Sequence, residues 1–208
     1  MTDHARRERR LLADLLLAEG PNAPTLCAGW TTRDLAAHIV VRDRRPDASA
    51  GIVLPALAAH GERVRLARAA LPYPELVEQL RKPPVWSPIS NPLTEGLVNT
   101  MEFFIHHEDV RRAGPQWAPR TLEAGEQVAL WRTGRFLSRA ALRRLKTSAT
   151  VHATGFEPVR VGPDPRVEIS GEPGELALFF FGRQSASRVR IEGDPETAQR
   201  LRTARMGV

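Results

Sequence analysis

The stretch that decides the fold is NTMEFFIHHEDVRRA, residues 99–113. Glu102 and His106 stand four residues apart in it, and residues at this spacing share one face of a helix. Apolar residues flank Glu102, and a carboxylate in such a run is rarely buried without a partner. We therefore expect both side chains to point into a helical bundle and to reach one divalent cation. The alternative is a plain hydrogen-bonded pair within the helix.

A second predicted helix, residues 31–45, offers a third ligand. Thr31 or Thr32 is the expected N-cap, and Asp34 in the first turn favours helix formation. His38 from this helix would complete a set of two imidazoles and one carboxylate that leaves coordination positions open for water or substrate. Taken alone, a single histidine on such a helix face is also typical of a structural residue.

Asp109 follows His106 by three residues and lies on the same side of the predicted helix. It is therefore a candidate to accept a hydrogen bond from the imidazole and hold it in place. An ion pair with Arg112 or Arg42 is the alternative. His107 is expected to point about 100° away from His106, so the two imidazoles are poorly placed for one ion.

Two regions of different character follow one another along the chain. Residues 1–147 are predicted to be helical and to form the metal-binding bundle, and residues 148–208 a small α+β domain, so the fold class is mainly α. The four prolines of KPPVWSPISNP, residues 82–92, rule out regular helix there. The other predicted elements are helices at 1–20, 56–71, 74–81, 93–112, 121–145, 175–181 and 195–205, with Thr121 and Asp194 as N-caps, and strands within 147–154, 159–163, 166–171 and 187–193.

The composition of the 208 residues is that of an ordinary globular protein, with 42% hydrophobic and 26% charged residues. No apolar run is long enough to span a membrane, and the single cysteine, Cys27, fits a reducing compartment, so we expect a cytoplasmic protein. Cys27 is expected to be a small buried hydrophobe. The net charge of +6 comes from arginines interleaved with acidic residues along nearly every helix, which argues against a nucleic-acid-binding surface.

Three stretches resemble one family. TLCAGWTTRDLAAHIVVRDRRP, NTMEFFIHHEDVRRA and ELALFFFGRQSASRVRIEGDPE are similar to the two helical motifs and the C-terminal domain of the mycothiol-dependent maleylpyruvate isomerase family of DinB-like metalloproteins. The resemblance implies an up-down-down-up four-helix bundle that binds zinc through His38, Glu102 and His106. It also implies mycothiol as cosubstrate. The family's isomerase adds this thiol across the cis double bond of maleylpyruvate, allows rotation and then eliminates it.

The expected function is a zinc-dependent, mycothiol-dependent isomerase or thiol transferase acting on a small electrophilic or unsaturated acid. By resemblance, Arg183 would bind a substrate carboxylate, although a surface role for this arginine is equally open. The alternative function is a metal-binding sensor or interaction module without catalysis. Two imidazoles and a carboxylate also suit nickel or iron, and a homodimer is compatible with the sequence but not required by it.

Overall fold

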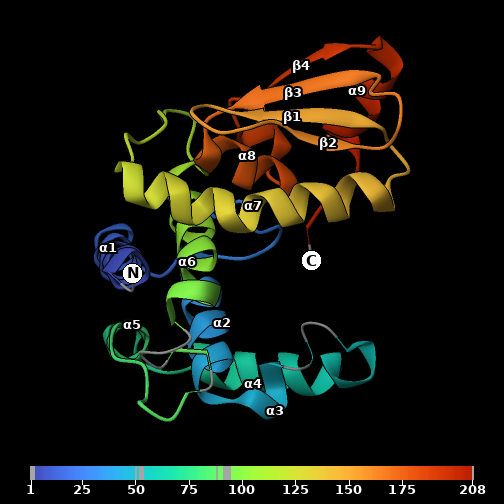
Figure 1. Ribbon diagram of the computed structural model, residues 1–208. Helices are drawn as coiled ribbons and strands as arrows, with labels where there is room; N and C mark the ends of the chain where they lie inside the picture. Colours follow the sequence, from blue (N-terminus) through green and yellow to red (C-terminus); the bar gives the residue numbers. More distant parts are fainter. Residues whose placement is uncertain (1–2, 50, 52–53, 88, 91–94, 208) are drawn as a thin grey trace. The chain divides into compact units, whose positions relative to one another are not determined.

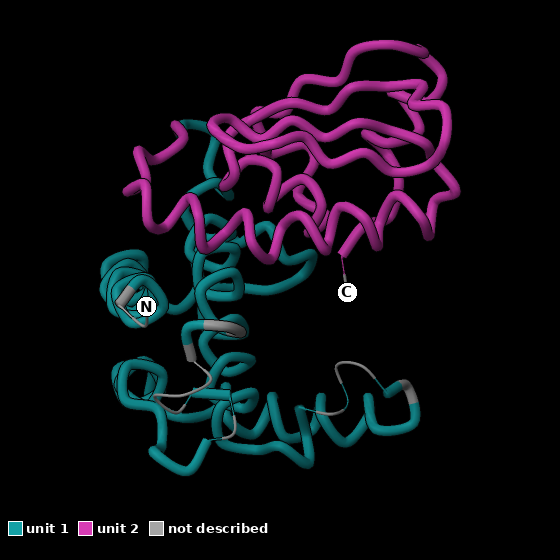
Figure 2. The backbone as a smooth tube through the Cα atoms, in the orientation of Figure 1, with its two compact units in different colours: residues 1–117 teal, residues 118–208 magenta. Residues whose placement is uncertain are grey.

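The computed structural model describes residues 3–49, 51, 54–87, 89–90 and 95–207. The chain divides into two compact units, residues 1–117 and 118–208 (Figure 2). None of the helices in the described ranges is long and apolar enough to cross a membrane.

In the described residues of the first unit, the named elements are all helices (Figure 1). Helix α1 packs on α5 and α6, and α2 packs on α4 and α5. Their contact faces form one core that includes Leu12, Leu35, Leu76 and Phe103, all fully buried. The elements are α1 (Asp3–Glu19), α2 (Thr32–Arg44), α3 (Pro46–Ser49), η2 (Pro55–Leu57), α4 (Ala58–Ala69), α5 (Tyr73–Arg81) and α6 (Glu95–Arg111).

Helix α2 begins where the sequence predicts. Thr31 is the N-cap: its hydroxyl accepts a hydrogen bond from the backbone N–H of Asp34, and the Asp34 carboxylate accepts one from the backbone N–H of Thr31. This reciprocal capping box satisfies two backbone donors that the first helical turn leaves open. It fixes the start of the helix that carries His38 one turn further on.

A short helical element follows α2 directly. Pro46–Ser49 forms a single helical turn, α3. Proline is compatible with the first position of a helix, because no intrahelical partner is needed for its nitrogen. The proline-rich connection 82–92 is non-helical wherever it is described; residues 88, 91 and 92 lie outside the described residues, as do 93 and 94 of the predicted helix 93–112.

The second unit combines a small four-stranded sheet with helices, as predicted. The strand order is β2-β1-β3-β4. The central strands β1 and β3 are parallel, with Val151 opposite Ile169; β2 runs antiparallel to β1, and β4 runs antiparallel to β3. Alternate residues of β1 are buried under α7 and α8, which lie on one side of the sheet (Figure 1). The elements are α7 (Ala124–Arg144), β1 (Ala149–Ala153), β2 (Val159–Val161), β3 (Val167–Gly171), α8 (Pro173–Phe180), η3 (Gln184–Ala186), β4 (Arg190–Gly193) and α9 (Pro195–Thr203).

The two predicted caps of this unit have different outcomes. Asp194 caps α9 as expected, because its carboxylate accepts a hydrogen bond from the backbone N–H of Thr197 at 2.8 Å. Thr121 does not cap α7, so that prediction is wrong: the helix starts at Ala124, and its first turn closes on the carbonyl of Glu123. Helix α7, which the sequence analysis grouped with the preceding helices, lies within residues 118–208.

Candidate metal centre

Glu102 and His106 lie on one face of α6 and contact each other. The Nε2 atom of His106 is 3.2 Å from Oε1 of Glu102. The flanking residues Phe103 and Ile105 are fully buried and anchor this part of α6 in the core. The helix therefore holds the carboxylate and the imidazole at the spacing expected for two groups on successive turns.

His38 approaches the same carboxylate oxygen from α2. Its Nε2 atom is 3.5 Å from Oε1 of Glu102, and its ring centroid is 5.4 Å from that of His106. The ligand atoms of the three side chains all lie within 4.8 Å of one another. Zinc bonds of about 2.0–2.1 Å at the tetrahedral angle put ligand atoms about 3.3 Å apart. The two measured separations bracket that value, so the donor set fits a zinc-sized cation.

Arg42 also reaches Glu102. Its Nε lies 3.4 Å from Oε1, and its Nη1 donates a hydrogen bond to Oδ1 of Asn99 at 2.7 Å. Arg42 follows His38 by four residues, so the two side chains share a face of α2. The four-residue spacing from His38 could have identified Arg42 as a site residue. From the sequence, Arg42 was expected only as an alternative ion-pair partner of Asp109. The guanidinium places a positive charge at the edge of the site.

Asp109 lies against His106. Its Oδ2 is 3.0 Å from Nδ1 of His106, and the carboxylate is fully buried. Arg112, a candidate partner of Asp109, lies against Glu108 with its Nε 2.5 Å from Oε2. His107 is directed to α1, where its Nδ1 is 3.0 Å from Oε2 of Glu8. The two neighbouring imidazoles therefore have different partners: His106 contacts Glu102 and Asp109, and His107 contacts Glu8.

Burial and hydrogen bonding set the protonation of the cluster. Burial alone would raise the pKa of Glu102, but hydrogen bonds from His106 and His38 and the nearby charge of Arg42 hold that pKa well below its usual range. Burial opposes the charged form of His106, yet hydrogen bonds with Asp109, Cys27 and Glu102 raise its pKa well above normal. Burial lowers the pKa of His38. Without a cation, these pKa shifts favour the ionised form of Glu102, the charged form of His106 and the neutral form of His38.

A second layer of contacts fixes His38. The ring of Trp30 lies 5.2 Å from the His38 ring, and the Arg65 guanidinium stacks 5.0 Å from the centroid of Trp30. Nη1 of Arg65 also donates to Asp34 at 2.6 Å, and its other nitrogens pair with Glu62. Arg65 thereby links α4 to the capping box of α2. Nothing in the sequence pattern identified Arg65, because its contact with Asp34 spans 31 residues.

Cys27 lies beside this cluster rather than only in the core. It is half-buried, and its Sγ donates a hydrogen bond to Oδ2 of Asp109 at 3.2 Å. The expectation of a small buried hydrophobe covers only part of its role: the side chain packs against the core of the unit, but its thiol also contacts Asp109. The contact joins residues 82 positions apart, so local sequence patterns could not predict it.

Arg183 belongs to the second unit. Its Nη1 donates to the carbonyl of Phe181 at 2.9 Å, and its guanidinium lies 5.5 Å from the Phe181 ring centroid. Its assignment to a substrate carboxylate stays a prediction.

Comparison with family models, with curated proteins and with solved structures found no match to this chain. The site is therefore interpreted from its own geometry.

Proposed function

We propose that the first unit binds a divalent metal ion, most simply zinc, through His38, Glu102 and His106. The observation that carries the proposal is the convergence of two imidazole Nε2 atoms on one carboxylate oxygen, at 3.5 and 3.2 Å. Both separations are close to the ligand spacing of a tetrahedral zinc site. A half-buried carboxylate next to two imidazoles is also the donor chemistry that zinc, nickel and iron share.

The arrangement favours a reactive centre over a closed structural one. Among the residues that the structure describes, no fourth histidine, cysteine, aspartate or glutamate joins this group of three. The side chains of His38 and Glu102 are 14% and 17% exposed, so solvent reaches the cluster. Catalytic zinc sites keep a coordination position open in this way, whereas structural sites are closed by four protein ligands.

The proposed reaction is the transfer or addition of a small thiol to an electrophilic or unsaturated acid, by an isomerase or transferase of the mycothiol-dependent, DinB-like kind that the sequence resembles. A bound zinc ion would keep such a thiol in its thiolate form at neutral pH. The chain's own groups complete the site: Asp109 orients His106, and the charge of Arg42 attracts an acidic substrate. In this proposal the four-helix DinB-like bundle is the scaffold, and mycothiol is the cosubstrate.

Metal content tests the first part of the proposal. Wild-type protein from metal-replete expression should carry close to one zinc, nickel or iron per chain, and His106→Ala should lose it. His60→Ala is the matched control, because His60 also contacts a carboxylate, that of Asp47 at 2.9 Å, but lies outside the cluster. Metal-free wild type, or equal metal content in wild type and His106→Ala, would refute the site.

A thiol-conjugate screen tests the reaction. Purified wild type and His106→Ala are incubated with mycothiol and a panel of electrophilic and unsaturated acids, and products are identified by mass spectrometry. The proposal expects a conjugate or an isomerised acid with the wild type only. A metal-loaded wild type that forms no product would instead point to a metal sensor or interaction module built on the same centre.

A further inference from the structure

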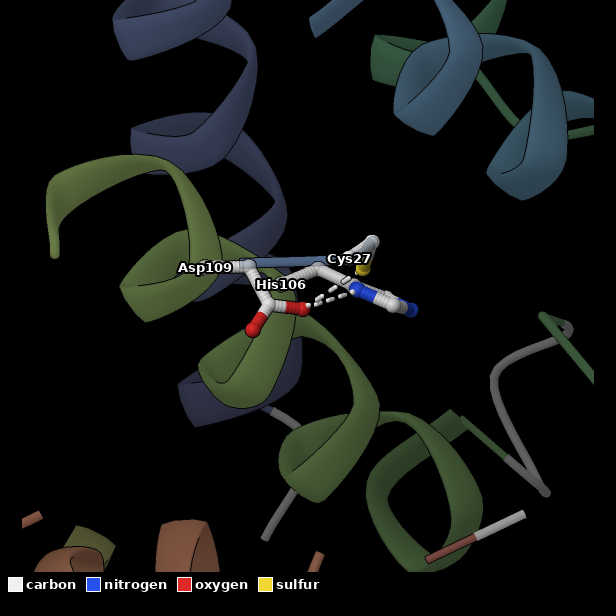
Figure 3. Close-up of side chains that lie close together, drawn as sticks. All are labelled: Cys27, His106 and Asp109. Atoms are coloured by element: carbon white, nitrogen blue, oxygen red, sulfur yellow. Dashed lines mark hydrogen bonds and ion pairs between the residues drawn. The ribbon is translucent and has the colours of Figure 1, made fainter. Parts of the chain in front are cut away.

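A second group of potential ligands lies on the opposite side of the His106 ring. Figure 3 shows Cys27 and His106 converging on the Asp109 carboxylate. Oδ2 of Asp109 is 3.2 Å from Sγ of Cys27 and 3.0 Å from Nδ1 of His106. The ligand atoms of these three side chains all lie within 4.8 Å of one another. The group thus offers sulfur, nitrogen and oxygen donors around one point.

The backbone holds Cys27 firmly against α6. The N–H of Leu26 donates to the carbonyl of Asp109 at 3.0 Å, which joins the loop to the helix one residue from the thiol. The N–H of Trp30 donates to the carbonyl of Cys27, and the Thr25 hydroxyl accepts from the N–H of Cys27. The thiol is therefore positioned by a structured turn and not by a mobile loop.

We propose that Cys27, His106 and Asp109 form a thiolate-containing cation site for a thiophilic divalent metal such as cadmium or zinc. With zinc bonds of about 2.3 Å to sulfur and about 2.1 Å to oxygen, tetrahedral geometry requires a sulfur–oxygen separation of about 3.6 Å. The measured 3.2 Å has only to open by a few tenths of an ångström. Soft thiolate ligands select soft cations, so this site differs in preference from the nitrogen and oxygen set at His38.

The two sites exclude each other. A neutral imidazole carries one lone pair and one N–H, so only one ring nitrogen of His106 can bind a cation at a time. A cation at Nδ1 puts the proton on Nε2, where it is donated to Glu102, 3.2 Å away. The site at His38 then loses one of its three ligands. A thiophilic metal bound at Cys27 therefore displaces the metal of the proposed catalytic centre, and each chain binds one cation.

Cadmium titration followed by ultraviolet absorption tests the inference. Cys27 is the only cysteine in the chain, so in a thiol-free buffer any thiolate-to-cadmium charge-transfer band reports on this residue. We expect the band to reach its full height at one equivalent of cadmium in wild type. It should be lost in Cys27→Ser and Cys27→Ala, and kept in His38→Ala, because His38 is not one of the three ligands. Circular dichroism checks that all variants are folded.

Several outcomes would overturn the inference. The first two are the absence of the band in wild type and its loss in His38→Ala. The others are saturation at half an equivalent, as when one cation joins two chains, and simultaneous binding of two equivalents. The proposed function is tested separately by zinc or cobalt binding to Cys27→Ser, which keeps His38, Glu102 and His106. If Cys27→Ser binds neither zinc nor cobalt while wild type shows the normal cadmium band, the site of His38, Glu102 and His106 is rejected and the site at Cys27 is retained.

Discussion

The contact between Asp109 and His106 gives the sharpest test of the proposed metal centre. Asp109→Asn keeps the size of the side chain but removes the charge that lies 3.0 Å from Nδ1 of the ligand imidazole. Losing such an orienting carboxylate typically weakens metal binding about 10- to 100-fold. Because the carboxylate is fully buried, solvent cannot replace it easily, so we expect a loss within this range.

The magnitude follows from ligand linkage. At free zinc 100 times the wild-type Kd, binding stabilises the folded state by about 2.7 kcal/mol. At the same free zinc, a tenfold weaker variant gains about 1.4 kcal/mol and a hundredfold weaker one about 0.4 kcal/mol. The assay is urea unfolding with and without chelator-buffered zinc. Only the zinc-induced increment within each variant is compared, so any change in the stability of the metal-free protein cancels.

Asp47→Asn is the matched control. Asp47 also contacts an imidazole, with its Oδ2 2.9 Å from Nε2 of His60, but this pair lies outside the cluster. The control should keep the full increment of about 2.7 kcal/mol. If Asp109→Asn keeps it too, Asp109 does not orient a metal ligand. If neither the wild type nor the control gains stability from zinc, the metal centre itself is refuted.

Three further outcomes are expected. In the metal-free protein, the raised pKa of His106 contributes stability that is complete below pH 6.5 and is lost as pH rises through that raised pKa. The lowered pKa of Glu102 contributes stability that is present above pH 4.5 and is lost in acid; urea unfolding should show both flanks in wild type, and Glu102→Gln should reduce the acid one. Zinc affinity should rise with pH into the range above 6.5, because the cation must displace the His106 proton; a pH-independent Kd in competition titrations would contradict this. Asp34→Asn should cost about 1 kcal/mol of unfolding free energy, because it breaks the capping box, whereas Glu19→Gln, an exposed change of the same charge, should cost much less.

Local interactions explain which parts of the structure the sequence predicts. The start of α2 depends on Thr31 and Asp34, and the start of α9 on Asp194, and these contacts lie within three residues. The contact between Glu102 and His106 is equally local, because helix geometry alone places them together. Thr121 shows where local prediction fails. Threonine is a favourable N-cap residue, but capping propensity does not decide which of several neighbouring residues begins the helix, and the first turn of α7 closes on the carbonyl of Glu123.

The rest of the site depends on tertiary contacts. The residue types make His38 a candidate third ligand, but helical spacing says nothing about whether it meets Glu102, since the two lie on different helices. The contact between Cys27 and Asp109 is set by how the loop before α2 packs on the end of α6. No sequence pattern indicated a role for Arg65 in the site, because that role depends on the packing of α4 against Trp30. Charge and spacing therefore identify ligand candidates, whereas packing decides which of them converge.

The proton on His106 connects the two proposed sites. When His106 loses its second proton to bind a cation, an N–H kept at Nδ1 donates to the buried carboxylate of Asp109 and leaves the lone pair on Nε2, facing Glu102 and His38. Asp109 therefore favours the nitrogen and oxygen site whenever Cys27 remains a thiol. A cation that binds sulfur strongly enough to remove the thiol proton reverses this preference, because it takes Asp109 as a ligand and Nδ1 as a donor. One imidazole can thus sort cations by softness, since only a soft cation gains enough from the thiolate to overcome the hydrogen bond that Asp109 provides.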